Sequence, residues 1–458
     1  MRTVYFLFLL CFSQLLSYGQ TLPAFKPLRY DEDYSTLRND SNSSWYDRMK
    51  YSPVSKNGKS YTSLGGEIRY QYFNFKNEDW GDAPKDRDGY ILTRYLFHAD
   101  LHAGNRTRFF VQLQSSLANG KLSGPSPVDE NQLDLHQAFA DFKLTRPGMQ
   151  QWMARIGRQE LSFGSQRLVA VRDGPNNRQS FDAARIMYAG EHIKADAFYS
   201  HYVLSRKNIF DDGFNKNTRF WGSYLVVNNV PVLQNADIYY LGLSKKNAIF
   251  DDGDGKELRH SIGSRIWKKQ GKWMYDFEGL YQWGKFSGKN IAGWTLSSNT
   301  SYNFSSLKCN PQLGLKTELI SGDKSYDDNR LNTFNPLFPR GAYFGLAALI
   351  GPANLADIHP SLSLEFSPKI DLAIDYDAFW RYSSNDGIYA PNVSLIYSGK
   401  GTKEKFIGQQ YSTELSYTPN RFLYFRAELT WFKTGAYLKE VSAGKNILFT
   451  GFTAQLKF

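Results

Sequence analysis

The sequence predicts an all-β fold, a transmembrane antiparallel β-barrel of about eighteen strands with short turns at one end and long loops at the other. Apolar and polar residues alternate along most of the chain, and aromatic residues make up 16% of it beside 22% charged residues. Short connections alternate with long ones between these segments. A wall that faces lipid outside and water inside requires this mixture, because successive side chains of a strand point to opposite faces.

Residues 1–19 are expected to be an export signal that is removed, so that the mature chain begins at Gln20. Arg2 supplies the positive charge, and the apolar core from Val4 to Leu16 is too short to span a membrane. No later stretch approaches ~20 uninterrupted apolar residues, which excludes a helical membrane protein. Once the signal is gone Cys309 is the sole cysteine, so no intramolecular disulfide is expected.

Two further parts follow the signal. Residues 20–60 show no clear periodicity and are expected to form an N-terminal periplasmic segment. That segment is a strap, a partial plug of the barrel or simply a tether, and the sequence does not choose among these. Residues 61–458 are expected to form the transmembrane barrel.

The alternation is clearest just after residue 272, where odd positions are mostly aromatic and the positions between them polar. Trp273, Tyr275 and Phe277 alternate with Asp276 and Glu278, which gives a strand with one greasy face and one polar face. Several segments of this kind are long enough to cross a bilayer at a tilt. Eighteen strands are expected to begin near Tyr61, Tyr90, Asn105, Gln132, Gln151, Ser180, Glu191, Asn217, Asn235, Glu257, Lys272, Ile291, Cys309, Ser361, Lys369, Gln409, Asn420 and Lys445.

The connections indicate how the barrel is oriented. Those after even-numbered strands are short, such as Gly104-Asn105, whereas those after odd-numbered strands include long stretches such as 322–360 and 384–408. Bacterial outer-membrane barrels have short periplasmic turns and long extracellular loops, so an even strand count places both termini in the periplasm. The last strand ends on Phe458 and resembles the assembly signal of such proteins, so outer-membrane lipid and the barrel assembly machinery are the expected partners. A soluble β-sandwich is less favoured, because it hides its greasy face and rarely needs strands this long.

The formal charge of +11 raises the possibility of nucleic-acid binding. Lys and Arg are dispersed along the chain, whereas surfaces that bind nucleic acid gather them on one face or helix. No nucleic-acid partner is therefore expected. A pore that favours anions fits the dispersed pattern better.

No catalytic or metal site is predicted, and no cofactor. The Gly-x-Ser-x-Gly elbow of serine hydrolases is absent. The runs Asp211-Asp212-Gly213 and Asp251 to Gly255 lack the EF-hand spacing, and Asp and Gly are ordinary turn residues. Calcium binding at these two runs stays open.

Strand parity predicts which charged residues face the lumen. Rings of Arg at a constriction select anions, since guanidinium groups bind carboxylates through two hydrogen bonds. The alternative for any one residue is that its charge keeps the lumen wet or pairs across the wall. Apart from the residues named below, the lumen candidates are Glu67, Asp100, Arg106, Arg108, Asp141, Lys143, Arg381 and Arg426.

Several motifs resemble the alginate export family of outer-membrane porins. The densest is RIGRQELSFGSQRLVAVRDGPNNRQSFDAARI at Arg155–Ile186. The others are YDEDY at Tyr30–Tyr34, LGGEIRYQY at Leu64–Tyr72, DGYILTRYLFHADLH at Asp88–His102 and DLHQAFADF at Asp134–Phe142. Beyond about residue 225, only the strand pattern and the closing strand agree with the family.

The resemblance implies a monomeric barrel of eighteen strands with an Arg-rich conduit for a polyuronate. It indicates as conduit or inner-loop residues Arg69, Arg94, Arg155, Arg158, Arg167, Arg172, Arg178 and Arg185. Arg155 and Arg158 have opposite parity, so both face the lumen only if a bulge intervenes or one of them lies at a strand end. The alternative is that these Arg residues brace the wall through ion pairs with Glu160, Asp173 and Asp182.

The favoured hypothesis is a channel for anionic solutes, with an acidic polysaccharide such as alginate or its oligomers as substrate. A second hypothesis is a surface binding or adhesion barrel plugged by residues 30–57 and the loop 322–360. A hydrolase with its site in the loops is the third. The sequence gives neither the substrate nor the direction of transport.

Overall fold

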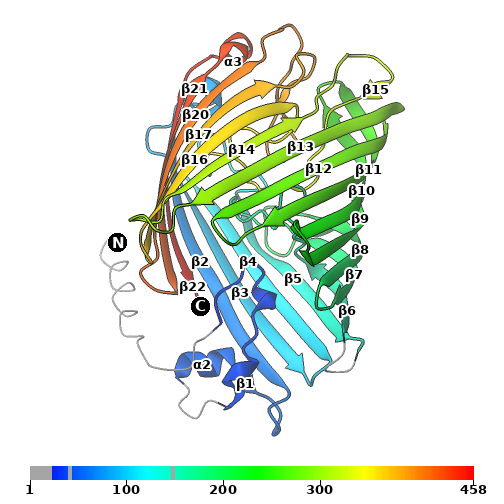
Figure 1. Cartoon of the computed structure of the whole chain (residues 1–458), viewed down its shortest axis with the longest axis vertical. Coiled ribbons are helices and arrows are strands. Elements are labelled where there is room, and N and C mark those ends of the chain that lie inside the picture. Colours follow the sequence, from blue (N-terminus) through cyan, green and yellow to red (C-terminus); the bar gives the residue numbers. More distant parts are fainter. Residues whose placement is uncertain (1–22, 40–43, 146–149) are drawn as a thin grey trace.

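The computed structural model describes residues 23–39, 44–145 and 150–458, and within them it confirms the predicted fold class. The chain forms one antiparallel barrel, in which each long strand pairs with the next and β22 returns to pair with β2 (Figure 1). The expected export signal, residues 1–19, lies outside the described residues. A helix long and apolar enough to cross a membrane does not occur in the described part of the chain.

Eighteen strands build the wall within the described residues. They are β2 (Tyr61–Lys76), β3 (Tyr90–Ala103), β4 (Thr107–Asn119), β5 (Asn131–Lys143), β6 (Gln151–Gln159), β7 (Phe181–Ala189), β8 (Ile193–Leu204), β9 (Gly213–Val230), β10 (Gln234–Phe250), β11 (Gly253–Lys268), β12 (Trp273–Phe286), β13 (Lys289–Asn303), β14 (Gln312–Ile320), β16 (Leu355–Ser367), β17 (Ile370–Arg381), β20 (Phe406–Tyr417), β21 (Leu423–Thr434) and β22 (Ile447–Lys457).

Shorter elements lie before the barrel and in its loops. They are η1 (Arg29–Asp31), η2 (Ser35–Asn39), α2 (Trp45–Lys50), β1 (Ser52–Pro53), η3 (Glu78–Gly81), β15 (Arg330–Leu331), β18 (Ile388–Tyr389), β19 (Leu395–Tyr397) and α3 (Ala436–Val441). In α2, Ser44 and Asp47 form a capping box that satisfies backbone N–H groups at the start of the helix.

Most strands begin close to the predicted residues, and the largest difference is in β16. It begins at Leu355, although the alternation predicted a start at Ser361. Pro360 lacks a backbone N–H and is uncommon inside a sheet. Here the pairing of β16 with β17 is interrupted between Ile358 and Ser361, so the proline lies where that ladder is broken.

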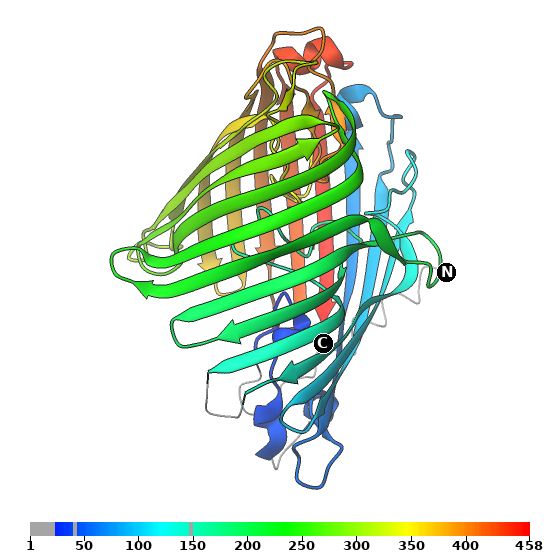
Figure 2. The same ribbon diagram turned by 90° about the vertical axis from the view of Figure 1, so that its right-hand side faces the viewer.

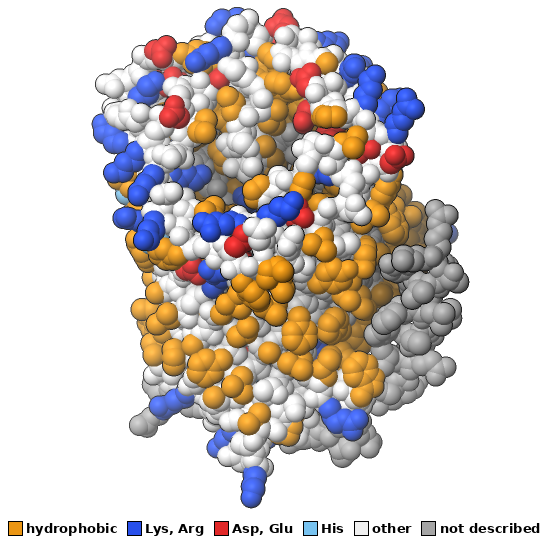
Figure 3. Space-filling view, turned by 180° about the vertical axis from the view of Figure 1, so that it is seen from behind, with side chains coloured by type: hydrophobic (Ala, Val, Ile, Leu, Met, Phe, Trp, Pro, Cys, Tyr) orange, Lys and Arg blue, Asp and Glu red, His pale blue; other side chains and the backbone are white. Residues whose placement is uncertain are grey.

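Alternation along β2 shows how the wall is built. Tyr70 and Tyr72 are exposed on the outside, whereas Glu67, Arg69 and Gln71 are buried on the inside. The same arrangement in the other strands gives a band of hydrophobic side chains around the outer wall, with Lys and Arg gathered at the rim of the long-loop end (Figure 3). The outer surface therefore matches a bilayer core bordered by polar headgroups.

The interior is occupied by two segments from the long-loop end. Residues 160–180, between β6 and β7, and residues 321–354, between β14 and β16, meet through a parallel bridge between Val169 and Phe338. The Phe338 ring packs edge-on against Phe181 and Phe220 on the inner wall. We call these segments the first and second inner loops, and their apolar residues form the main core of the molecule.

Residues 23–39 and 44–58 lie at the opposite end, where the turns are short. In Figure 2 this segment is dark blue and lies close to the C-terminus. The short strand β1 adds to β2, with Ser52 opposite Thr62. Both ends of the barrel domain are thus at the short-turn end.

Candidate functional site

The first inner loop turns into the barrel directly after β6. Gly164 has a left-handed φ of +56°, and a side chain there would overlap the hydroxyl group of Tyr224. Glycine is the residue that adopts such a turn without steric cost. The sequence around it therefore folds the loop inward instead of out into solvent.

Two arginines of the wall hold the tip of this loop. Arg69 on β2 and Arg94 on β3 are directly opposite in register. Arg69 donates hydrogen bonds to the carbonyl oxygens of Asp173 and Pro175, both at 2.7 Å. Arg94, fully buried, donates to the Asp173 carbonyl at 3.1 Å and contacts the Glu67 carboxylate at 2.6 Å. Glu67 offsets the repulsion between the two guanidinium groups.

The Asp173 carboxylate joins this pair to a third arginine. Its Oδ1 atom accepts hydrogen bonds from Arg94 at 2.6 Å and from Arg178 at 3.1 Å. The side chain is nevertheless 54% exposed, because it borders a cavity inside the barrel. The surrounding protein favours the neutral acid, but the charges of Arg94, Arg178 and Arg69 outweigh this effect and hold the pKa of Asp173 well below its usual range.

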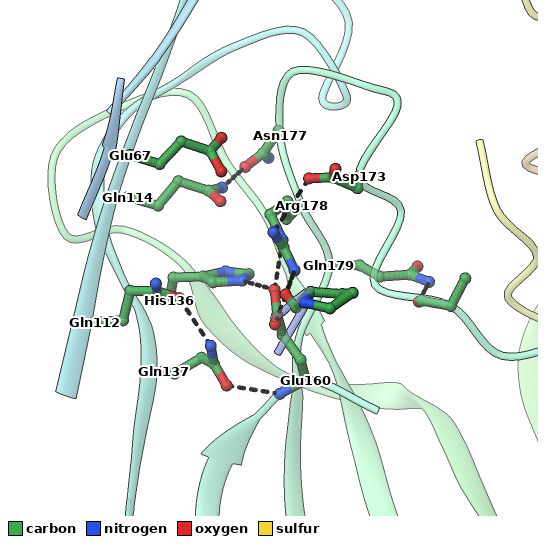
Figure 4. A network of polar contacts seen from close by, with 12 residues as sticks. Glu67, Gln112, Gln114, His136, Gln137, Glu160, Asp173, Asn177, Arg178 and Gln179 are labelled. Carbon is green, nitrogen blue, oxygen red and sulfur yellow. Dashed lines mark hydrogen bonds and ion pairs between the residues drawn. The ribbon is translucent and has the colours of Figure 1, made fainter. Parts of the chain in front are cut away.

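Arg178 is anchored at the base of the loop (Figure 4). It donates two hydrogen bonds to Glu160, at 2.6 and 3.0 Å, and Nε2 of His136 lies 2.8 Å from the same carboxylate. Burial opposes the charge of Arg178, but Glu160 and Asp173 raise its pKa above the ordinary value. Gln137 accepts a hydrogen bond from the backbone of Glu160, so β5 fixes the start of the loop.

The far end of the loop reaches the opposite wall through Arg167. This side chain donates to Glu278 on β12 at 3.1 Å and to Glu318 on β14 at 2.8 Å. It also contacts the hydroxyl group of Tyr343 in the second inner loop at 2.9 Å. The first inner loop therefore crosses the lumen, held by arginines of one wall and by carboxylates of the other.

The remaining predicted conduit arginines take different positions. Arg155 is buried, forms a 2.6 Å ion pair with Asp141 and stacks on the Tyr30 ring. Arg185 pairs with Asp196 on the neighbouring strand. Arg172 is almost buried and makes no hydrogen bond or ion pair within the described residues.

Arg158 lies on the other face of β6 from Arg155, as their parity indicated. It is directly opposite Asp182 in register and pairs with it at 2.9 Å. The pair is on the outward face of the wall, so the structure does not bring Arg158 together with the arginines of the lumen.

The other lumen candidates divide between the wall and the mouth. Asp100 and Arg108 form an ion pair at 2.6 Å on adjacent strands, and Arg426 pairs with Glu428 at 2.7 Å. Arg381 is buried and donates to backbone carbonyl oxygens of the loop between β17 and β20. Arg106 and Lys143 lie exposed at the short-turn end, where both line one cavity.

Sequence reasoning missed His136 and Tyr343. The pairing of β4 with β5 shifts register between Gln112 and Leu113, so His136 and Gln137 are both buried although they are adjacent. Strict alternation assigns only one of them to the lumen. Tyr343 belongs to a loop without a periodic pattern, and no local signal predicts its contact with Arg167.

The two Asp-Gly runs have different surroundings. Carboxylate oxygens of Asp134, Asp211 and Asp212 lie within 4.8 Å of one another, but Asp212 already accepts hydrogen bonds from Asn131 and from the backbone of Arg206. In the second run, Asp251 accepts hydrogen bonds from Tyr326 and from the backbone of Gly399. That run ties the short turn between β10 and β11 to two of the long loops, 321–354 and 382–405.

Two cavities open at the short-turn end. One has a volume of about 450 Å³ and lies between residues 30–35 and the start of β4. The other, about 640 Å³, is lined by Phe25, Arg421, Arg426, Lys457 and the side chain of Asp173. Asp173, which the arginines of the lumen bind, therefore also lines the second cavity.

Comparisons with known proteins agree with this architecture. No curated protein matches the chain. Among solved structures, similar ones include OccK11 (OpdR) of Pseudomonas aeruginosa, with a TM-score of 0.55 and 12% identity over 87% of this chain and 96% of that chain. A BenF-like porin from Pseudomonas fluorescens Pf-5 has a TM-score of 0.57 and 12% identity over 87% of this chain and 98% of that chain.

OccK2 (OpdF) of Pseudomonas aeruginosa, solved in complex with glucuronate, has a TM-score of 0.56 and 12% identity over 87% of this chain and 98% of that chain. At such identities the likeness shows the fold alone. The sequence profile of the family described as "Alginate export" matches residues 60–446, which is most of the chain. The protein therefore belongs to the alginate export family and is a β-barrel of the outer membrane.

Proposed function

We propose that this outer-membrane channel passes anionic solutes, and that its substrates are acidic polysaccharides such as alginate, or their oligomers. The proposal includes a monomeric barrel without enzymatic activity, inserted by the barrel assembly machinery. The family and the porin-like fold support the channel itself. The choice of anions rests on the lumen.

One observation carries this choice. The Asp173 carboxylate is bound by Arg94 and Arg178, and its side chain is half exposed to the lumen. These guanidinium groups thus already bind a carboxylate at a position that water reaches. A carboxylate of a passing solute has the same geometry and charge, so it can replace Asp173 there.

Carboxylates beside the arginines keep such binding weak. A solute anion must compete with Glu67, Asp173 and Glu160 for the same donors. A conducting site has to bind well enough to admit the solute and weakly enough to release it. The glucuronate bound to OccK2 shows that one barrel of this fold accepts a sugar acid, which supports the same class of ligand here.

The test removes one carboxylate inside the lumen and a matched one outside it. Asp173→Asn leaves Arg94 and Arg178 with less negative charge near them, so we expect the chloride-to-potassium permeability ratio in planar bilayers to rise roughly threefold or more. Asp182→Asn removes the partner of Arg158 on the outer face and should leave the ratio unchanged. Cation selectivity in the native protein would refute the proposal.

A surface binding or adhesion barrel is the second candidate, because both inner loops pack into the lumen around Phe338. A barrel of that kind would conduct no ions in its native form. Ion conductance of the native protein at the single-channel level separates the two functions.

A further inference from the structure

Residues 23–39 cross the mouth of the barrel at the short-turn end, and we call them the strap. Residues 30–33 and Ser35 line the cavity of about 450 Å³ on one side. Ala24 and Phe25 line the cavity of about 640 Å³ on the other. A cavity thus lies on each side of the strap, and both volumes are in the range of cavities that enclose single small molecules.

Polar contacts fasten the strap to the rim where the barrel closes. Arg29 donates hydrogen bonds to the carbonyl oxygens of Gly66 on β2, at 2.9 Å, and of Phe458 at the C-terminus, at 2.8 Å. Glu32 neutralises this buried arginine at 2.6 Å. Arg421, in the turn between β20 and β21, donates to the Pro23 carbonyl at 2.6 Å.

The inner side of the strap reaches the first inner loop. The Tyr30 ring packs edge-on against Phe110 and Phe139 of the wall, and its hydroxyl group donates to the Glu160 carbonyl at 3.1 Å. Arg178 donates to the Pro27 carbonyl at 3.1 Å. The strap therefore rests on the same two residues that anchor the arginine cluster.

We propose that the strap sets the size of the solutes that this channel passes, a role that rests on the proposed function. While the strap is docked, only molecules that fit the two cavities beside it should pass. An extended polymer requires the strap to leave the mouth. Its removal breaks no strand pairing, because Arg29 binds the Gly66 and Phe458 carbonyl oxygens through its side chain, and the backbone hydrogen bonds between these two residues do not depend on it.

The strap also differs from the inner loops in how little holds it. Its apolar contacts are two small buried clusters, one around Tyr30 and one around Tyr34 and Leu37, and the packing of Phe25 against Phe422. The inner loops share the main core. Local opening is easiest where few buried apolar contacts must be lost. Of the segments that fill the lumen, the strap is the one expected to move first.

The experiment measures pore size with polyethylene glycols of graded mass as blockers in planar bilayers, a gauge that does not depend on solute charge. The double variant Arg29→Ala, Tyr30→Ala removes the two main anchors of the strap. We expect a roughly twofold or larger rise in single-channel conductance and a higher mass limit for polymers that enter the pore. Lys26→Ala is the matched control, because its side chain contacts only the strap itself, at the Asp31 carbonyl.

A second experiment fixes the strap in its docked position with a covalent cross-link. In a Cys309→Ser background, Ser35→Cys and Arg106→Cys line the same cavity and can be joined by a flexible bis-maleimide. The locked protein should pass monomeric uronate in liposomes and exclude longer uronate oligomers, whereas the unlocked double variant Arg29→Ala, Tyr30→Ala should admit the longer oligomers.

An unchanged mass limit in Arg29→Ala, Tyr30→Ala, together with passage of long oligomers through the locked protein, would overturn the role of the strap. Anion selectivity is measured separately in the same bilayers. Loss of selectivity with an intact size effect would contradict the proposed function and leave the strap as a size filter.

Discussion

The two halves of the barrel wall carry their charges differently. The first wall, β2 to β7, presents Arg69, Arg94 and Arg155 to the interior. The second wall, β12 to β21, presents carboxylates that include Glu278, Glu318, Asp357, Asp377 and Glu428. Each wall holds the segment of complementary charge. Arginines of the first bind carbonyl oxygens and Asp173, while carboxylates of the second bind Arg167 and the backbone N–H of Leu346.

Because of this difference, polar contacts with both walls hold the first inner loop in the lumen, in addition to the packing of its apolar residues. The first inner loop carries Asp173 toward the first wall and Arg167 toward the second. We expect an anion in the lumen to pass the arginines that already bind Asp173.

The largest expected effect comes from removing a buried arginine of the first wall. Arg94→Met leaves Glu67 buried without its partner, and breaking a buried ion pair in this way costs about 3–5 kcal/mol. Arg426→Met in the second wall removes a half-buried side chain between Glu414 and Glu428 and should cost about 1 kcal/mol. Guanidinium-induced unfolding from lipid vesicles measures both. If the two variants lose the same free energy of unfolding, the two walls do not differ in how they hold their charges.

A smaller effect separates two carboxylates within the second wall. Glu318 and Asp357 are directly opposite in register and both buried. Glu318 accepts hydrogen bonds from Arg167 and Tyr343, each at 2.8 Å, so Glu318→Gln should destabilise by about 2 kcal/mol.

Asp357 is the matched position, because neither of its carboxylate oxygens has a hydrogen-bond partner. Asp357→Asn replaces a buried carboxyl group that has no hydrogen-bond partner, so the free energy of unfolding should be unchanged or higher by up to about 1 kcal/mol. If Asp357→Asn is the more damaging change, Glu318 does not anchor the first inner loop as described.

The sequence predicted the wall better than its contents. Which side of β2 faces lipid follows from neighbours two residues apart, so Tyr70 and Arg69 were assigned to opposite faces correctly. The register shift opposite His136 depends on the partner strand and leaves no mark in the alternation. Strand parity therefore does not predict which residues face the lumen where a β-bulge shifts the register.

The inner loop shows a further limit. Gly164, Asp173 and Arg178 belong to one motif, but the contacts of Arg69 with Asp173 and of Arg167 with Glu318 join residues more than a hundred positions apart. A guanidinium group serves equally to bind a solute or to hold a carbonyl oxygen. Only the path of the loop shows that Arg69 holds backbone, and that path is set by the packing around Phe338.

The smallest effect is a pH response that differs between the two halves. In the second inner loop, burial raises the pKa of Asp323 to about 7, helped by Asp252, Asp386 and Asp328. Burial likewise raises the pKa of Asp386 to about 6, with Asp251 adding to the shift. The folded state then binds more protons than the unfolded state between about pH 4 and pH 7, so this region is most stable in acid and loosens as the pH rises.

Asp173 in the first inner loop behaves oppositely. Its pKa lies below the unfolded value, so its contribution is complete above about pH 4 and is lost only below it. Hydrogen exchange at pH 4.5 and 7.5, corrected for the intrinsic rate, should show residues 321–335 better protected at pH 4.5 and residues 160–180 unchanged. Asp323→Asn should remove most of that difference, since the titrating group is gone while its acceptor for the Asn332 N–H remains. Equal responses in both loops would mean that the charge environments of the two walls do not control how their loops are held.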